Sequence, residues 1–422
     1  MPTPAVLPVP FFRVQQPGPA ARPLPAGLSR TAAFYLYASI IVFFLAGSSA
    51  PTSLYGTYQA RWGFSPVTVT VVFGVYALAV LVALLVFGRL SDHLGRRPVL
   101  LIATLVQAFT MLLFATAQGV DTLIAARVVQ GLSTGAAAGA VGAGLLDLDR
   151  AKGAVANAVG PMLGTATGAL ASGLMVTYLP APTILVYAVL GAIFVAQAIG
   201  LRAVRESTTP RPGALATLRP RFNLPAQSRA AMALAVPALV AAWSLVGFYG
   251  SLGPALVRYL LRSNSAAPGG LVLAVLAASG ALAVMVSHRR SPRFMTLVGA
   301  TTLMAGVAIT LVAISRASAT VLFIGAVVAG AGFGNTFQGA IRSVILPAPA
   351  SERAGVLSVL YVVAYLAMGS PAVLAGLGVV HGGGLLPTAR TYGLAVIALA
   401  AVALIGTLLR RPVESNGHRI SN

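Results

Sequence analysis

The chain has 422 residues, of which 58% are hydrophobic and 8% are charged, about a third of the charged fraction of a typical soluble domain. This composition excludes a soluble globular protein, because too few polar side chains remain to face water. The formal net charge is +21, and cysteine is absent, which excludes disulfides, thiolate metal sites and cysteine nucleophiles.

Residues 1–30 are rich in proline and also contain arginine. We predict a disordered cytoplasmic tail there. A secretory signal is not indicated, because the start lacks a basic region and prolines interrupt every apolar stretch.

Apolar runs then recur along the chain, each about 20 residues long, which is the length of a helix that crosses ~30 Å of hydrocarbon. The runs are continuous rather than alternating, which favours helices over a β-barrel. We therefore predict an all-α integral membrane protein with twelve transmembrane helices. Their expected ranges are 31–52, 66–88, 97–117, 121–145, 153–178, 182–202, 229–250, 268–288, 294–314, 318–341, 353–378 and 390–410.

The segment 203–228, between the sixth and seventh helices, is basic and broken by prolines. It predicts a cytoplasmic linker between two six-helix bundles, 31–202 and 229–410, with 411–422 as a second tail. The fourth helix (RVVQGLSTGAAAGA) and the tenth (GAGFGNTFQGAIR) both space glycines about four apart, and each is fourth in its half. Such pseudo-symmetric halves are a common transporter plan, with the substrate site near the midplane between them.

The loops give the orientation. With both termini cytoplasmic, the inside segments hold 22 of the 28 basic residues and the outside segments hold five. This charge is spread over all the cytoplasmic loops and is not gathered on one face, so we expect no nucleic-acid partner.

The loop GRLSDHLGRRPVL concentrates charge in an otherwise apolar chain. Gly88 and Gly95 would let this loop approach a neighbouring helix closely. Asp92 could pair with arginine or cap a helix N-terminus, such as that of the eleventh helix near Arg353. We expect these contacts to form in the outward-open state and to break in the inward-open state, which would make the loop a gate. An ordinary positive-inside turn is the alternative.

The twelve helices, the two halves and this loop resemble the major facilitator superfamily (MFS) over residues 31–410. The loop signature of that family, Gly-x-Leu-x-Asp-x-x-Gly-Arg-Arg, is matched by Gly88, Leu90, Asp92, Gly95, Arg96 and Arg97. The fourth helix resembles a second family signature through Arg127, Gln130 and Gly131. The loop between the eighth and ninth helices, SHRRSPR, lacks the acidic residue that a second copy of the loop signature would carry.

The fifth helix, AVGPMLGTATG, resembles the family's antiporter signature through Gly160, Pro161 and Gly164. Ala156 and Thr165 stand where that signature has glycines. This helix makes the chain look most like the bacterial drug-efflux (drug:proton antiporter) group. The resemblance implies a hinge at these three residues that seals the cytoplasmic leak path, whereas simple close packing is the alternative.

Arg127 is the candidate for substrate binding or proton relay, because a charge within a membrane helix costs at least ~2–3 kcal/mol unless it faces water or a partner. Snorkelling to the outer surface is the alternative. The other candidates are polar or aromatic residues at membrane depth: Gln107, Gln130, Asn157, Trp243, Tyr249, Asn335, Gln338, Tyr361 and Tyr365. We expect Tyr55, Tyr58 and Tyr259 to belong to an interfacial aromatic belt.

None of the seven acidic residues falls in the middle of a predicted helix; they are Asp92, Asp121, Asp147, Asp149, Glu206, Glu352 and Glu414. A buried carboxyl is the usual proton carrier, because burial raises its pKa. Proton antiport is therefore implied by the resemblance but has no such carrier, and the remaining candidates are Asp92, Asp147 and Asp149. An anionic or neutral substrate suits Arg127, whereas a cationic one would rely on aromatic faces.

The leading hypothesis is a secondary transporter of the cell membrane that exports small amphipathic molecules by alternating access. The alternatives are an uncoupled facilitator or importer of a narrow range of metabolites, and an MFS-like receptor that does not transport. An enzyme is disfavoured because H-E-x-x-H and paired buried carboxylates are absent, and the absence of G-x-x-x-x-G-K-[ST] excludes nucleotide-driven transport within this chain. We expect a monomer with no cofactor or metal, whose partners are the substrate, the lipid bilayer and protons.

Overall fold

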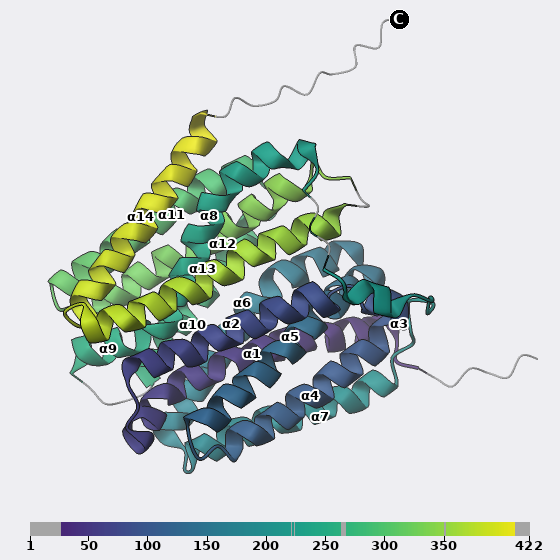
Figure 1. The fold of residues 1–422 in the computed structure, drawn as a ribbon, viewed down its shortest axis with the longest axis horizontal. Coiled ribbons are helices and arrows are strands. Elements are labelled where there is room, and N and C mark those ends of the chain that lie inside the picture. Colours follow the sequence, from purple (N-terminus) through teal and green to yellow (C-terminus); the bar gives the residue numbers. More distant parts are fainter. Residues whose placement is uncertain (1–26, 221, 223, 263–266, 350–351, 410–422) are drawn as a thin grey trace, which may run out of the picture.

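The computed structural model describes residues 27–220, 222, 224–262, 267–349 and 352–409. Within this part, 12 helices are long and apolar enough to cross a membrane, which confirms the predicted number (Figure 1). The N-terminal half contains α1 (Arg30–Trp62), α2 (Pro66–Phe87), α4 (Arg96–Ala115), α5 (Val120–Leu148), α6 (Arg150–Tyr178) and α7 (Pro182–Arg202). The C-terminal half contains α8 (Ala226–Ser251), α10 (Ala267–Ser287), α11 (Pro292–Ser315), α12 (Ala319–Ile345), α13 (Arg353–His381) and α14 (Leu385–Leu409).

Three shorter elements join the spanning helices: α3 (Ser91–Leu94), the 3₁₀ helix η1 (Ala214–Leu218) and α9 (Gly253–Leu261). Figure 1 shows α3 at one end of the bundles and α9 at the other. We call the end with α3, where α1 begins and α14 ends, the termini side, and the end with α9 the opposite side. The predicted tails lie almost wholly outside the described residues.

The first helix is longer than predicted, because α1 continues past Pro51 to Trp62. A proline is tolerated within a membrane helix when neighbouring groups satisfy the freed backbone. The helix ends at Gly63, which has a left-handed φ of 66° and whose N–H donates to the Gln59 carbonyl.

This extension places two tyrosines inside the N-terminal bundle. Tyr55 and Tyr58 are only 4% and 1% exposed, and the Tyr58 hydroxyl donates to the Tyr187 hydroxyl at 3.1 Å. The predicted interfacial position is therefore wrong for both residues, because the longer helix turns them toward α5 and α7. Tyr259 is 56% exposed, as expected of a residue at the bundle surface.

Small residues hold the helices of the N-terminal half together. Gly131, Gly135 and Gly139 of α5 lie against α2, and a Cβ on Gly135 would come within 2.5 Å of the Val80 carbonyl oxygen. Lipid tails are as apolar as the side chains, so membrane helices associate through such close packing.

The candidate hinge residues take part in the same kind of packing. Gly160 and Gly164 lie directly against α1, and α6 is one continuous helix with Pro161 inside it. The described contacts of these residues are within the N-terminal half, and their role as a hinge stays a prediction.

The halves meet chiefly where α2 lies beside α13 and where α6 lies beside α10 (Figure 1). A Cβ on Gly74 of α2 would lie 3.0 Å from Val373 of α13, and one on Gly376 would lie 3.0 Å from the Cβ of Thr70. These positions belong to the half of α2 that is nearer the opposite side. The two bundles are therefore in close contact on the opposite side.

The substitution Gly135→Ala tests this packing. We expect it to destabilise the protein by about 1–3 kcal/mol, because the added methyl group overlaps the α2 backbone. The measurement is thermal unfolding of the purified protein in detergent. In the matched control Gly191→Ala, the new Cβ would sit 3.5 Å from Met111 Cβ, and we expect stability to stay equal or rise. Equal stability of the two variants would contradict the packing argument.

Candidate functional site

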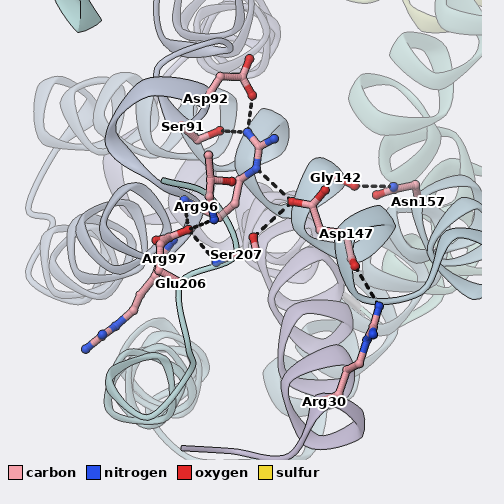
Figure 2. A network of polar contacts seen from close by, with 11 residues as sticks. Arg30, Ser91, Asp92, Arg96, Arg97, Gly142, Asp147, Asn157, Glu206 and Ser207 are labelled. Carbon is pink, nitrogen blue, oxygen red and sulfur yellow. Dashed lines mark hydrogen bonds and ion pairs between the residues drawn. The ribbon is translucent and has the colours of Figure 1, made fainter. Parts of the chain in front are cut away.

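The charged loop on the termini side is part of a polar network that includes the linker (Figure 2). Gly95 has a φ of 100°, and α4 begins immediately after it without a hydrogen bond from a cap side chain. The carboxylate of Glu206 supplies that cap, because it accepts from the Arg96 and Arg97 backbone N–H groups at 2.8 and 2.9 Å. A Cβ on residue 95 would lie 2.6 Å from this carboxylate, so both the φ angle and the space require glycine there.

The Arg96 side chain is the centre of this loop network. Its guanidinium donates to Ser91 Oγ at 2.8 Å, to the Asp92 carboxylate, and to Asp147 Oδ2 of α5 at 3.4 Å. The Arg96 side chain is 12% exposed, whereas the Asp92 side chain is 50% exposed. Figure 2 shows how these groups join the loop to the end of α5.

Two further contacts extend the network to the linker and to α1. Ser207 donates to Asp147 Oδ2 at 3.2 Å, and Arg30 donates to the backbone carbonyls of Asp147 and Leu148 at 3.1 and 2.7 Å (Figure 2). The network thus ties the start of α1, the loop, the end of α5 and the linker into one unit.

Asp92 therefore pairs with Arg96 of its own loop. Arg353 at the start of α13 donates to the Ala348 carbonyl, and no ion pair among the described residues joins the two halves. The predicted contact between Asp92 and the eleventh helix is not formed in this structure, and the gate stays a prediction. Sequence reasoning did not identify Glu206 as a member of this network. The available signal was an acidic residue shortly after α7, in a chain that has only 7 acidic residues.

A second cluster surrounds Arg127, which is only 1% exposed and so does not snorkel to the surface. Its Nε donates to the Tyr55 hydroxyl at 3.1 Å, and its Nη1 donates to the Ser48 carbonyl at 2.9 Å and to Gln130 Oε1 at 2.6 Å. The Gln130 amide in turn donates to the Gly47 carbonyl at 2.9 Å. We call this group the arginine cluster.

Aromatic rings complete the surroundings of Arg127. Its guanidinium carbon lies 5.6, 5.3 and 5.7 Å from the ring centres of Tyr55, Tyr76 and Phe114. No carboxylate among the described residues bonds to it. A buried charge without a countercharge is costly, and the ring faces and carbonyl oxygens offset only part of that cost.

A third cluster lies in the C-terminal half, where Trp243 of α8 meets rings from α12 and α13. Its ring centre is 6.4 and 5.2 Å from those of Phe333 and Phe337, and 5.1 Å from that of Tyr365. Trp243 Nε1 is buried and has no hydrogen-bond partner among the described residues, although a buried indole N–H usually finds one. The ring centre of Tyr361 lies 6.4 Å from that of Tyr365. We call these five residues the aromatic cluster.

The arginine and aromatic clusters approach each other across the interface between the halves. Trp243 and Tyr365 pack against a buried group formed by Phe73 and Ala77 of α2 with two residues of α13. Tyr76, whose ring faces Arg127, lies on α2 between Phe73 and Ala77 of that buried group. A polar and an aromatic surface therefore meet at the contact between α2 and α13.

The remaining candidates lie apart from this meeting point or are engaged elsewhere. Asn157 donates to the Gly142 carbonyl at 2.9 Å, Asn335 accepts from Ser287, and Tyr249 shares a hydrogen bond of 2.6 Å with Thr310. Gln107 is fully buried beside Gly47 and Phe194, and its amide has no partner among the described residues. Gln338 is half-buried.

Sequence reasoning missed Phe333, Phe337 and Tyr76 as members of these clusters. The two phenylalanines are four residues apart, which places them on one face of a helix, and this was the available signal.

One segment of α5, GLSTG at residues 131–135, has the G-x-S-x-G spacing of a hydrolase nucleophile. That motif needs a sharp strand-to-helix turn that exposes the serine. Here Ser133 lies inside a continuous helix, is 4% exposed and donates to the Ala103 carbonyl at 2.8 Å. The spacing therefore reflects helix packing and not a catalytic elbow.

The fold and these clusters define a multi-pass α-helical membrane protein of the transporter class, built from two six-helix bundles with polar groups at their interface. Residues 36–368 match the family model described as Major Facilitator Superfamily. The chain belongs to this family of membrane transporters. A comparison with curated proteins gives no match.

Solved structures share the fold at low sequence identity. A crystal structure of the nucleoside transporter NupG superposes with a TM-score of 0.69 at 12% identity, covering 89% of this chain and 99% of that one. A bacterial homolog to the human lysosomal transporter Spinster, in an inward-facing and unoccupied conformation, gives 0.71 at 14% identity, covering 90% and 97%. In its inward-facing and occupied conformation the same homolog gives 0.68 at 14% identity, covering 90% and 95%. These similarities establish the fold, and they extend over nearly the whole of each chain.

The substitution Glu206→Ala tests the loop network. We expect it to lower the stability of the protein by about 1 kcal/mol, because two backbone N–H groups at the start of α4 lose their acceptor. Thermal unfolding in detergent measures the effect. Asp121→Ala is the matched control: this exposed carboxylate also lies in a first helical turn, so we expect only the smaller loss from the helix dipole. An equal loss in both variants would show that Glu206 acts only through its charge.

Proposed function

We propose that this transporter exports small amphipathic molecules, neutral or negatively charged, across the cell membrane by alternating access. The observation that carries the proposal is Arg127, a fully buried cation without a carboxylate partner among the described residues. An anionic group would gain a charge-assisted contact there, whereas a cation would be repelled. The aromatic cluster offers the apolar part of such a molecule a surface on the other side of the interface.

The proposed substrate site combines Arg127 and Gln130 with Trp243, Tyr361 and Tyr365. The first two residues belong to one half and the other three to the other half, so movement of the halves would change their separation. This is the geometry that alternating access requires. We further propose Asn157, Asn335 and Gln338 as residues that reach the substrate only in another state of the cycle.

The contacts between α2 and α13 support a state that is closed on the opposite side. With the termini placed in the cytoplasm by the loop charges, this corresponds to an inward-facing state, the state in which the Spinster homolog was crystallised. In the outward-facing state, Asp92, Arg96 and Arg97 would meet the second half. We propose that the loop network then acts as the inner gate, together with the hinge at Gly160, Pro161 and Gly164.

The direction of transport, export, is proposed because the sequence of α6 resembles the antiporter signature. Coupling to protons would use Asp147 or Asp92, whose carboxylates both bind Arg96. A second candidate function is an uncoupled facilitator. None of the described acidic residues lies in the central turns of a spanning helix, and a facilitator that moves no protons needs no carboxyl there.

Arg127→Gln tests the substrate class. Cells with and without the protein are loaded with fluorescein, an anion, and separately with Nile red, a neutral dye. We expect the wild type to lower the accumulation of both dyes, and a protonophore to restore it if export is proton-coupled. Arg127→Gln should reduce fluorescein export about tenfold and spare Nile red, because a charged hydrogen bond is lost.

The exposed Arg61→Gln is the matched control and should export both dyes normally. The amount of each variant in the membrane is measured in parallel. Equal loss of both dyes in Arg127→Gln would assign Arg127 a structural role and overturn its role in binding. Export that a protonophore does not change would favour the uncoupled facilitator.

The tryptophans provide a direct test of the aromatic cluster, because the chain has only 2, Trp62 and Trp243. In Trp62→Phe, a molecule that the cells export should change the emission of Trp243 in a saturable way, since that indole borders the proposed site. In Trp243→Phe, the emission of Trp62, which stacks on Tyr58 at 4.7 Å, should not change. A change in the second variant alone would place the substrate elsewhere.

A further inference from the structure

Arg258 lies on α9, a helix that the hydropathy pattern does not predict, on the opposite side of the bundles. Its side chain crosses the interface to α1 of the other half. A Cβ on Gly56 would lie 2.7 Å from Arg258 Nη1 and 3.2 Å from its Cζ, so the guanidinium rests directly on the α1 backbone. Any larger residue at position 56 would displace it.

This guanidinium has no acidic partner among the described residues, and it makes no hydrogen bond to any of them. The Arg258 side chain is half-buried, and this burial lowers the pKa of its guanidinium. An arginine nevertheless stays protonated in proteins. Arg258 therefore presents a partly desolvated positive charge whose donors are free to bind a ligand.

The charge borders a cavity of about 230 Å³ between the two halves. Tyr55 and Gln59 of α1 and Val69 of α2 form one wall, and Ala255 and Arg258 of α9 with Leu385 of α14 form the other. No acidic residue lines the cavity, and most of the remaining lining side chains are apolar. The cavity is smaller than the pockets that hold drug-sized ligands, which start near ~300 Å³.

Tyr55 belongs both to the arginine cluster and to the wall of this cavity. Its hydroxyl accepts from Arg127 Nε at 3.1 Å, while the residue also lines the cavity. Arg127 itself is not part of the cavity wall. Both arginines are thus near the same tyrosine, but only Arg258 borders the cavity.

We propose that this cavity is a second binding site, which takes a small amphipathic carboxylate with its charged group on Arg258 and its apolar part against the walls. The free guanidinium suits a carboxylate because its N–H groups match the two oxygens. Both halves contribute walls, so a bound carboxylate stabilises the state that is closed on the opposite side. The inference goes beyond the proposed function, since it does not require that the bound molecule be transported.

Isothermal titration of the purified full-length protein with benzoate tests the site. Benzamide, which has the same shape but no charge, is the comparison ligand. We expect benzoate to bind more tightly than benzamide, and Arg258→Gln to weaken benzoate binding by about ten- to a hundredfold without affecting benzamide. Arg262→Gln, which changes an exposed arginine at the end of the same helix, should bind benzoate like the wild type.

A filling variant keeps the test valid if Arg258→Gln does not fold. Ala255→Leu keeps the charge but occupies the cavity, and we expect it to weaken both ligands. The proposal is overturned if the wild type binds no benzoate, if benzamide binds equally well, or if neither variant weakens binding. It is also overturned if Arg127→Gln abolishes benzoate binding while Arg258→Gln keeps it, because the carboxylate would then occupy the arginine cluster.

Discussion

The structure depends on one constraint of the hydrocarbon solvent: a backbone or a charge that enters it must find its partners inside the protein. Helices satisfy the backbone, and the apolar composition satisfies the surface. Because lipid gives no hydrophobic reason for helices to associate, they are held by close contacts of small residues. The glycines of α5 against α2, and those of α6 against α1, are the result.

The same constraint determines where the few charged groups lie. Most of them lie at helix ends, where water and other polar groups are near. The loop network around Arg96 is the densest example, and in it every carboxylate binds an arginine or a backbone N–H group. Such a network joins four separate segments, so it can hold the termini side of the N-terminal bundle as a rigid unit while the two bundles move relative to each other.

Arg127 and Arg258 are the exceptions, since each is withdrawn from water without an acidic partner among the described residues. Arg258 lies at the contact between the halves, and Arg127 lies against Tyr76 of α2, one of the helices that form this contact. Tyr55 connects them, because it binds one guanidinium and lines the cavity of the other. Because Tyr55 belongs to both places, occupancy of the proposed substrate site at Arg127 and occupancy of the proposed site at Arg258 would depend on each other.

The sequence alone determined the membrane class, the number of spanning helices and the division into halves, because hydropathy, length and loop charge act locally. It also led to Arg127, Gln130 and the charged loop, since charge is rare enough in this chain to stand out. The helix ends were less certain: the first helix was expected to end at residue 52, although α1 continues to Trp62.

Only the tertiary structure decided which side chains meet. Tyr55 is buried because α1 is longer than expected. Glu206 of the linker caps the start of α4. Phe333 and Phe337 of α12 pack against Trp243 of α8. These contacts join residues far apart in the chain, and no local pattern encodes them. The cavity at Arg258 is the clearest case, because its walls exist only where the two halves are packed together.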